Sequence, residues 1–277
     1  MPQIPRTPAR SGAAVRKRST RRAVTVAARC GLATRGVLYL LVGLLALRIA
    51  FGETDEQADR SGAVAQLARQ PFGAVPVWAV GIGLVAMALW RLSEAVFGSA
   101  GPDGRTAGKR VLAAARAVVY AVAAISVLAF AAGVGGTRSG DEESRDATAT
   151  LLGIAGGWLV ALVGIGLAIG GVVIAVAAAR RTFHDKMDTG GLPDGVRTAV
   201  DVLGVVGGIA RGVVFTTAGG FLVYAAASYD PSKAKGIDDT LRAFASTPAG
   251  PWLLVAVAIG LVLFGVFSWA LAAWVRT

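Results

Sequence analysis

Six long apolar blocks dominate the sequence and restrict the folds that the chain can adopt. Each has at least 20 residues, which is enough for a helix to cross a hydrocarbon core of about 30 Å. With 55% hydrophobic and 16% charged residues, a soluble domain would have to hide most of its surface. The sequence therefore predicts an all-α integral membrane protein with six transmembrane helices. The blocks are 32–51, 75–97, 111–134, 151–179, 200–227 and 250–274.

The distribution of basic residues predicts how these spans are oriented. The N-terminal segment, the loops 91–110 and 180–199 and the C-terminal tail together carry 17 Arg and Lys, whereas the other three loops carry 7. Loops rich in Arg and Lys stay in the cytoplasm, so both termini are expected there. Arg outnumbers Lys and Ala, Gly and Val dominate the composition, which is typical of a GC-rich bacterial genome. We therefore expect a multi-pass protein of the bacterial cytoplasmic (plasma) membrane.

The N-terminal segment 1–24 is strongly basic and is expected to be a disordered cytoplasmic tail. Such a tail is attracted to anionic lipids of the inner leaflet, although its charges can equally serve only to fix the topology. No aromatic residue interleaves its charges, so no nucleic-acid partner is expected. The lipid bilayer is the expected partner, and the sequence names no protein partner.

Reactive residues are too few for most catalytic sites. The chain has one cysteine, Cys30, and one histidine, His184, which excludes a disulfide framework and the usual zinc sites. No nucleophile–base pair or ligand set is apparent. The sequence therefore predicts no enzyme activity, no metal and no cofactor.

An internal repeat organises the six spans into three pairs. The first helix of each pair carries an arginine followed four residues later by an aromatic residue, and the second helix carries a glycine-rich motif. The distance along the chain from this arginine to the glycine at the equivalent position of the second helix is 48, 50 and 49 residues in the three repeats. Chance matches between apolar segments would not keep such a regular spacing. The arginine motifs are Arg35–Tyr39, Arg116–Tyr120 and Arg211–Phe215.

The repeat units are 25–98, 108–182 and 197–275, which together form one membrane domain. Each has two spans, so all three units share one orientation and should be related by rotation about the membrane normal. We expect three tandem helix hairpins with approximate threefold pseudo-symmetry. An open arc of three hairpins is the alternative.

These motifs resemble those of domain-of-unknown-function family 1206, bacterial membrane proteins in which a two-helix unit occurs three times. The resemblance depends on Arg35–Tyr39 and on Leu67–Gly73 with the glycine-rich helix that follows. It covers about residues 25–275, and the second repeat departs from it at Ala117, where the other repeats have glycine. The resemblance implies a fold and a topology, but no activity.

The three repeat arginines are the candidate binding residues. A helical rise of about 1.5 Å per residue places Arg35, Arg116 and Arg211 at or slightly inside the cytoplasmic edge of the hydrocarbon core. Each can lie over the ring one turn deeper, at Tyr39, Tyr120 or Phe215. One interpretation is that they are snorkelling anchors at the membrane boundary. The other is that they form an approximate ring that binds anionic headgroups or another phosphate-bearing ligand.

Glycines within the spans are predicted to be helix-packing surfaces. Small residues at every fourth position allow helices to approach closely, and a glycine-lined pore or hinge is the functional alternative. The fifth span also has Thr216 in this series. The glycines are Gly204, Gly208, Gly212 and Gly220 in the fifth span, Gly166 and Gly170 in the fourth, Gly83 in the second and Gly260 in the sixth.

Several other polar residues have local explanations. Asp201 is expected to pair with Arg197, four residues earlier, and Arg48 to reach towards Glu53 or Asp55. The outer loops contain short amphipathic segments, one of them around Leu241, which we interpret as structural caps rather than lids.

Taken together, these features favour a non-catalytic membrane protein that acts as a scaffold or binds lipid. The alternative is a small channel or facilitator with a path along the pseudo-threefold axis.

Overall fold

The computed structural model describes residues 11–53, 56–98, 106–134, 139–187 and 193–274. Within these ranges it has six long apolar helices, each long and apolar enough to cross a membrane. This confirms the prediction of an all-helical multi-pass membrane protein. The long helices are α1 (Ser11–Ala50), α3 (Ala74–Phe97), α4 (Ala107–Ala131), α6 (Gly157–Ala179), α7 (Asp194–Ser228) and α9 (Gly250–Trp274).

Two boundaries differ from the predicted blocks. Helix α1 begins at Ser11 and so includes the second half of the segment 1–24 for which disorder was expected; its abundant Ala and Arg are good helix formers. The predicted block 151–179 is divided at Gly156, whose φ of 74° lies in the left-handed region that favours glycine. The residues before it belong to a separate helix, α5 (Gly140–Ala155).

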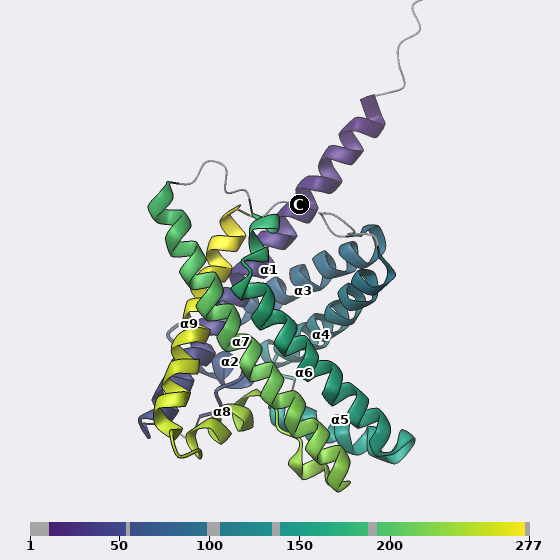
Figure 1. The fold of residues 1–277 in the computed structure, drawn as a ribbon. Coiled ribbons are helices and arrows are strands. Elements are labelled where there is room, and N and C mark those ends of the chain that lie inside the picture. The colour runs from purple at the N-terminus through teal and green to yellow at the C-terminus, as the bar shows by residue number, and fades with distance from the viewer. Residues whose placement is uncertain (1–10, 54–55, 99–105, 135–138, 188–192, 275–277) are drawn as a thin grey trace, which may run out of the picture.

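The long helices form an arc. In spatial order they run α4, α3, α1, α9, α7 and α6, each packed against the next, so that the last helix of the chain lies along the first (Figure 1). Helices α4 and α6, the two helices of the middle repeat, share no comparable contact. The arc is therefore open between them, and threefold pseudo-symmetry remains a prediction.

Three shorter helices lie at the end of the bundle opposite the chain termini, here called the outer end (Figure 1). They are α2 (Arg60–Ala68), α5 and α8 (Ile237–Ala245). Asp59 caps α2 by accepting a hydrogen bond from Gly62 N, and Ser139 and Glu142 form a capping box at α5. Leu241 is fully buried against the long helices, so α8 is packed onto the bundle.

Several predicted glycines lie where two helices approach closely. A Cβ at Gly83 would lie 1.7 Å from Thr34 Oγ1, and one at Gly260 would lie 2.2 Å from Ala210 Cβ. A Cβ at Gly204, Gly208 or Gly212 would come within 2.8 Å of a neighbouring helix or the loop after α6. Any side chain at these positions would force the helices apart.

Three of the predicted packing glycines face open space instead. A Cβ at Gly166, Gly170 or Gly220 would meet nothing within 4 Å. A four-residue step turns 40° further than one turn of a 3.6-residue helix, so the stripe on α7 rotates away from its partner before Gly220. The close contact between α6 and α7 uses Gly208 and Gly212 together with three glycines outside the prediction, Gly164, Gly171 and Gly219.

Candidate site: an arginine cluster

Two of the three repeat arginines meet at one aromatic ring. The guanidinium carbons of Arg35 and Arg211 lie 5.0 Å and 5.1 Å from the centre of the Phe264 ring, within cation–π range. Arg35 Nε donates a hydrogen bond to Ser268 Oγ (3.2 Å), and Arg211 Nε donates one to the Tyr39 hydroxyl (2.9 Å). Helices α1, α7 and α9 therefore bring together residues that are far apart in the sequence.

The predicted stacking of each arginine on the ring one turn deeper occurs in the third repeat, where Arg211 lies 5.2 Å from the centre of the Phe215 ring. In the first repeat the pairing is different. Tyr39 packs edge-on against Phe264 (4.8 Å between ring centres) and lies beside Arg211, not Arg35. The i,i+4 rule describes a single helix, whereas these rings are shared between helices.

A fourth arginine, which the repeat pattern did not indicate, joins the group. Arg91 in α3 is 9% exposed, lies 4.2 Å from the centre of a Trp90 ring and donates to Glu94 Oε2 (2.6 Å). Its Nε is buried and has no hydrogen-bond partner. Both of these contacts, with Trp90 and Glu94, lie within α3, so the spacing of Arg91 and Glu94, three residues apart, was a signal for the ion pair that the sequence offered.

We call Arg35, Arg91, Arg116 and Arg211, with Tyr39 and Tyr120, the arginine cluster. Tyr39 and Tyr120 pack in one side-chain cluster with Trp90 and Phe264, and Arg116 precedes Tyr120 by about one helical turn. Arg116, in α4, is exposed, whereas Arg35 is 9% exposed. The cluster thus reaches from the interior of the bundle to its surface.

Positive charge in the cluster exceeds negative charge. Among the described residues, Glu94 is the one carboxylate that is ion-paired to any of the four arginines. At an effective dielectric constant of about 20, two like charges 10 Å apart repel by roughly 1–2 kcal/mol. An anion placed among these guanidinium groups would remove that repulsion, and arginine forks match phosphate oxygens well.

The depth of the cluster follows from helix geometry. Arg91 is six residues before the end of α3, and Ser268 is six residues before the end of α9, which corresponds to about 9 Å at 1.5 Å per residue. Arg116 is nine residues from the start of α4, or about 14 Å. The cluster therefore lies one to three helical turns inside the end of the bundle that carries the termini.

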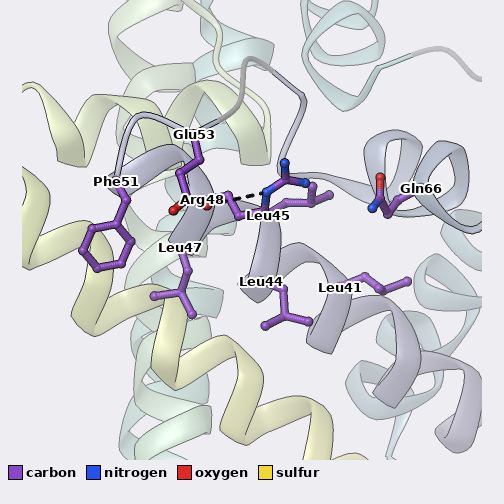
Figure 2. Close-up of a pocket in the computed structure, with 8 residues that line it drawn as sticks. All are labelled: Leu41, Leu44, Leu45, Leu47, Arg48, Phe51, Glu53 and Gln66. Atoms are coloured by element: carbon purple, nitrogen blue, oxygen red, sulfur yellow. Dashed lines mark ion pairs between the residues drawn. The ribbon is translucent and has the colours of Figure 1, made fainter.

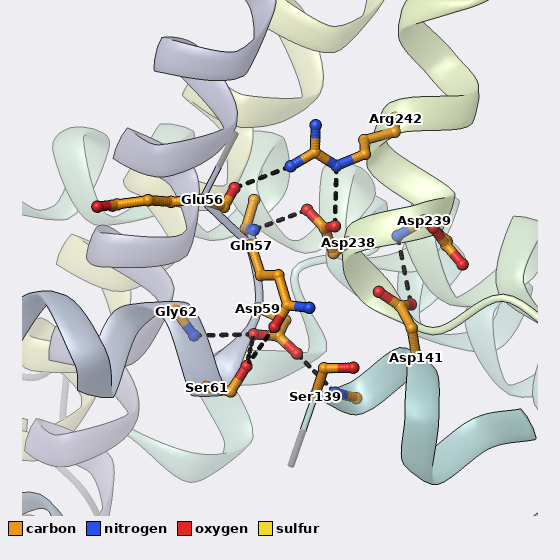
Figure 3. A network of polar contacts seen from close by, with 12 residues as sticks. Glu56, Gln57, Asp59, Ser61, Gly62, Ser139, Asp141, Asp238, Asp239 and Arg242 are labelled. Atoms are coloured by element: carbon orange, nitrogen blue, oxygen red, sulfur yellow. Dashed lines mark hydrogen bonds and ion pairs between the residues drawn. The ribbon is translucent and has the colours of Figure 1, made fainter. Parts of the chain in front are cut away.

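A second polar assembly, which we call the outer clasp, joins the three outer segments (Figure 3). Asp238 Oδ1 accepts a hydrogen bond from Ala58 N (2.7 Å), and Asp59 Oδ2 accepts one from Gly140 N (2.6 Å). Asp141 Oδ1 accepts a third hydrogen bond, from Asp239 N (3.3 Å). Each repeat is thus linked to the next in cyclic order.

Ion pairs support the outer clasp. Arg242 Nε donates to Asp238 (2.9 Å), Arg60 pairs with Glu143 (3.0 Å), and Arg145 pairs with Asp239. Burial and the neighbouring Asp239, Asp238 and Asp59 raise the pKa of Asp141 to about 6. Carboxylate oxygens of Asp141, Asp238 and Asp239 lie within 4.8 Å of one another, yet each of these carboxylates already has a protein partner.

At the other end of the bundle, the predicted pairing of Asp201 with Arg197 does not occur. Asp201 instead lies 3.2 Å from Arg181 and 2.7 Å from His184 Nε2. The segment after α6 folds back because Met187 is fully buried with Phe264 and Phe267, which brings His184 onto α7. Cys30 is exposed.

A pocket at the outer end of α1 is mainly apolar (Figure 2). Four leucines and Phe51 line it, with Arg48, Glu53 and Gln66 as its polar residues. Arg48 lies 3.9 Å from Glu53 and 4.0 Å from Glu56, and the other predicted partner, Asp55, is outside the described residues. The pocket lacks convergent polar groups, so it is a weaker candidate site than the arginine cluster.

Comparison with known proteins gives a family. A family model described as Domain of Unknown Function (DUF1206) matches three segments, 30–98, 111–181 and 206–275, one within each of the three predicted repeat units. The chain is 30% identical over 242 residues to "Uncharacterized protein YxxB" of Bacillus subtilis (strain 168), covering 87% of each chain. No solved structure matches the chain.

Proposed function

The chain belongs to the DUF1206 family, and because that family has no assigned activity, we propose a function from the arginine cluster itself. The protein is a non-catalytic component of the bacterial cytoplasmic membrane that binds anionic lipid headgroups from the inner leaflet. The main observation in support is that Arg35 and Arg211 both lie against the Phe264 ring, while neither is ion-paired to a carboxylate among the described residues.

The charge distribution along the chain supports this location. The end of the bundle that holds the cluster also carries most of the basic loop residues, so the positive-inside rule assigns it to the cytoplasm with both termini. Anionic lipids give that leaflet its negative surface potential, which contributes about 1 kcal/mol per Arg or Lys near the surface.

Three repeats with a pseudo-threefold relation are part of the same proposal. The cyclic order of the outer clasp supports it, as does the pairing of α3 with α4, α6 with α7 and α9 with α1. The lack of close packing between α4 and α6 is then a local departure in the middle repeat.

The channel alternative has less support. Between α1, α7 and α9 the bundle is filled by apolar side chains, including Leu45, Val214 and Leu261, each at most 3% exposed. A conducting path for ions or polar solutes needs polar groups or water along its length.

Lipid retention by purified protein tests the proposal. The Arg35→Gln/Arg211→Gln double variant should retain about tenfold less phosphatidylglycerol than the wild type, as measured by native mass spectrometry after membrane extraction. The Arg180→Gln/Arg197→Gln variant is the control, because it removes two exposed charges from the same end of the bundle. Equal loss in both variants, or no loss in either, would contradict a specific site. Solute flux into proteoliposomes well above that of empty vesicles would favour the channel instead.

A further inference from the structure

The hydrogen-bonding state of the cluster indicates what kind of anion it fits. Arg35 and Arg211 each use Nε for a fixed contact, with Ser268 and with Tyr39. Their terminal nitrogens have no hydrogen-bond partner among the described residues. An arginine anchored through Nε presents its terminal nitrogens as a fork, which suits bidentate binding of phosphate oxygens.

Arg91 supplies an independent observation. The residue is 91% buried, and its Nε is a buried donor without a partner. Such a donor carries a desolvation cost unless an acceptor reaches it. Because the Trp90 ring beside Arg91 packs in the same side-chain cluster as Phe264 and Tyr39, an acceptor for Arg91 would lie close to the residues that hold Arg35 and Arg211.

The charge count restricts the ligand further. Among the described residues, Glu94 is the one carboxylate that is ion-paired to any of the four arginines, so the cluster has three positive charges in excess. The phosphodiester of a simple anionic phospholipid carries one negative charge and would leave most of that excess in place. A diphosphate carries two to three negative charges on two linked phosphates and can engage two arginine forks at once.

From these observations we propose that the cluster is a binding site for a lipid diphosphate, in which Arg35, Arg91, Arg116 and Arg211 hold the diphosphate. This inference rests on the proposed function and specifies its ligand. Tyr39 positions Arg211 through the hydrogen bond between them. The lipid tail follows the exposed apolar surface of α4, where Val119 and Val122 are 65% and 52% exposed.

Binding of farnesyl diphosphate to the purified full-length protein in neutral detergent tests the inference. We expect it to bind at least about tenfold more tightly than farnesyl monophosphate, inorganic pyrophosphate or short-chain phosphatidylglycerol. Arg91→Gln and Arg116→Gln should each weaken it by about fivefold or more, whereas Arg180→Gln should not change it. Arg116 is exposed, so its substitution tests the site even if a buried arginine is needed for folding.

The outcomes separate this inference from the proposed function. Equal binding of the diphosphate, the monophosphate and phosphatidylglycerol, all sensitive to Arg35→Gln, would overturn the diphosphate assignment and leave lipid binding in place. Pyrophosphate binding as tight as that of farnesyl diphosphate would overturn the assignment to a lipid. Failure of every anion, phosphatidylglycerol included, would overturn both.

Discussion

The outer clasp and the arginine cluster both gather charged side chains from all three repeats, but they treat those charges in opposite ways. In the outer clasp, Asp59, Asp141 and Asp238 each accept a backbone hydrogen bond from another repeat, and Arg242 neutralises Asp238. In the arginine cluster, Glu94 neutralises Arg91, while Arg35 and Arg211 contact hydroxyl groups and aromatic rings and pair with no carboxylate among the described residues. One assembly satisfies its charges internally, and the other leaves them available.

This contrast separates two uses of buried charge. Breaking a buried pair is costly because it strands the remaining partner, so paired groups such as those of the clasp hold segments together. Unpaired cations have no such structural partner to lose. Their energetic cost is instead removed when a ligand binds, which links them to binding rather than to folding.

The largest effect on stability should come from breaking the clasp at Asp238. The Asp238→Ala variant leaves the buried Ala58 N–H without its acceptor and removes the carboxylate that Arg242 Nε binds, and it should lower the free energy of unfolding by about 3 kcal/mol. Thermal or denaturant unfolding of the detergent-solubilised protein would measure the loss. Glu53→Ala is the control, since the Glu53 side chain is 62% exposed. Equal stability of the two variants would show that the clasp does not hold the repeats together.

A smaller effect should appear as pH dependence of the clasp. The pKa of Asp141 is about 6 in the folded protein, against an ordinary value of 3.8, so the folded state binds this proton more tightly than the unfolded chain. The resulting stability is fully present below about pH 4 and is lost as the pH rises through 6, by about 1–3 kcal/mol. Melting temperatures at pH 5 and pH 7.5 would measure it. The wild type should lose more stability over this interval than Asp141→Asn, and parallel profiles would contradict the prediction.

The smallest effect on stability is expected within the arginine cluster. Arg35→Met replaces an unpaired cation by an apolar side chain of similar length, so the free energy of unfolding should change by about 1 kcal/mol or less, in either direction. The same variant should lose anionic lipid in the retention assay. A loss of stability as large as that of Asp238→Ala would make Arg35 a structural residue and remove the contrast between the two assemblies.

The sequence predicted those features of the fold that repeat at fixed spacing. Apolar blocks of membrane-spanning length predicted the six long helices, and the register of Arg35, Arg116 and Arg211 placed three arginines at similar depth. Equal depth alone does not bring such residues together, because the face of each helix on which they lie is set by packing. The sequence therefore predicted the level of the candidate site in the bundle but not its contacts.

Contacts between repeats were not predictable in the same way. Arg91 has no counterpart in the repeat motif, and the Phe264 ring that Arg35 and Arg211 share comes from α9. Gly220 lies on a face of α7 without a close neighbour, because residues spaced by four turn slightly further around a helix than one full turn. His184 reaches Asp201 because Met187 is buried, which is a tertiary effect. Each of these features depends on packing between segments distant in sequence.

The packing of α9 against α1 has a consequence for synthesis of the protein. Arg35 and its hydrogen-bond partner Ser268 are 233 residues apart, so at 5–20 residues per second the ribosome delivers the partner roughly 10–50 s later. During that interval α1 can pack against α3, but its longest interface is missing. A nascent chain interrupted before α9 would hold an arginine within the bilayer without Ser268 or Phe264, a state that membrane quality control could distinguish from the finished protein.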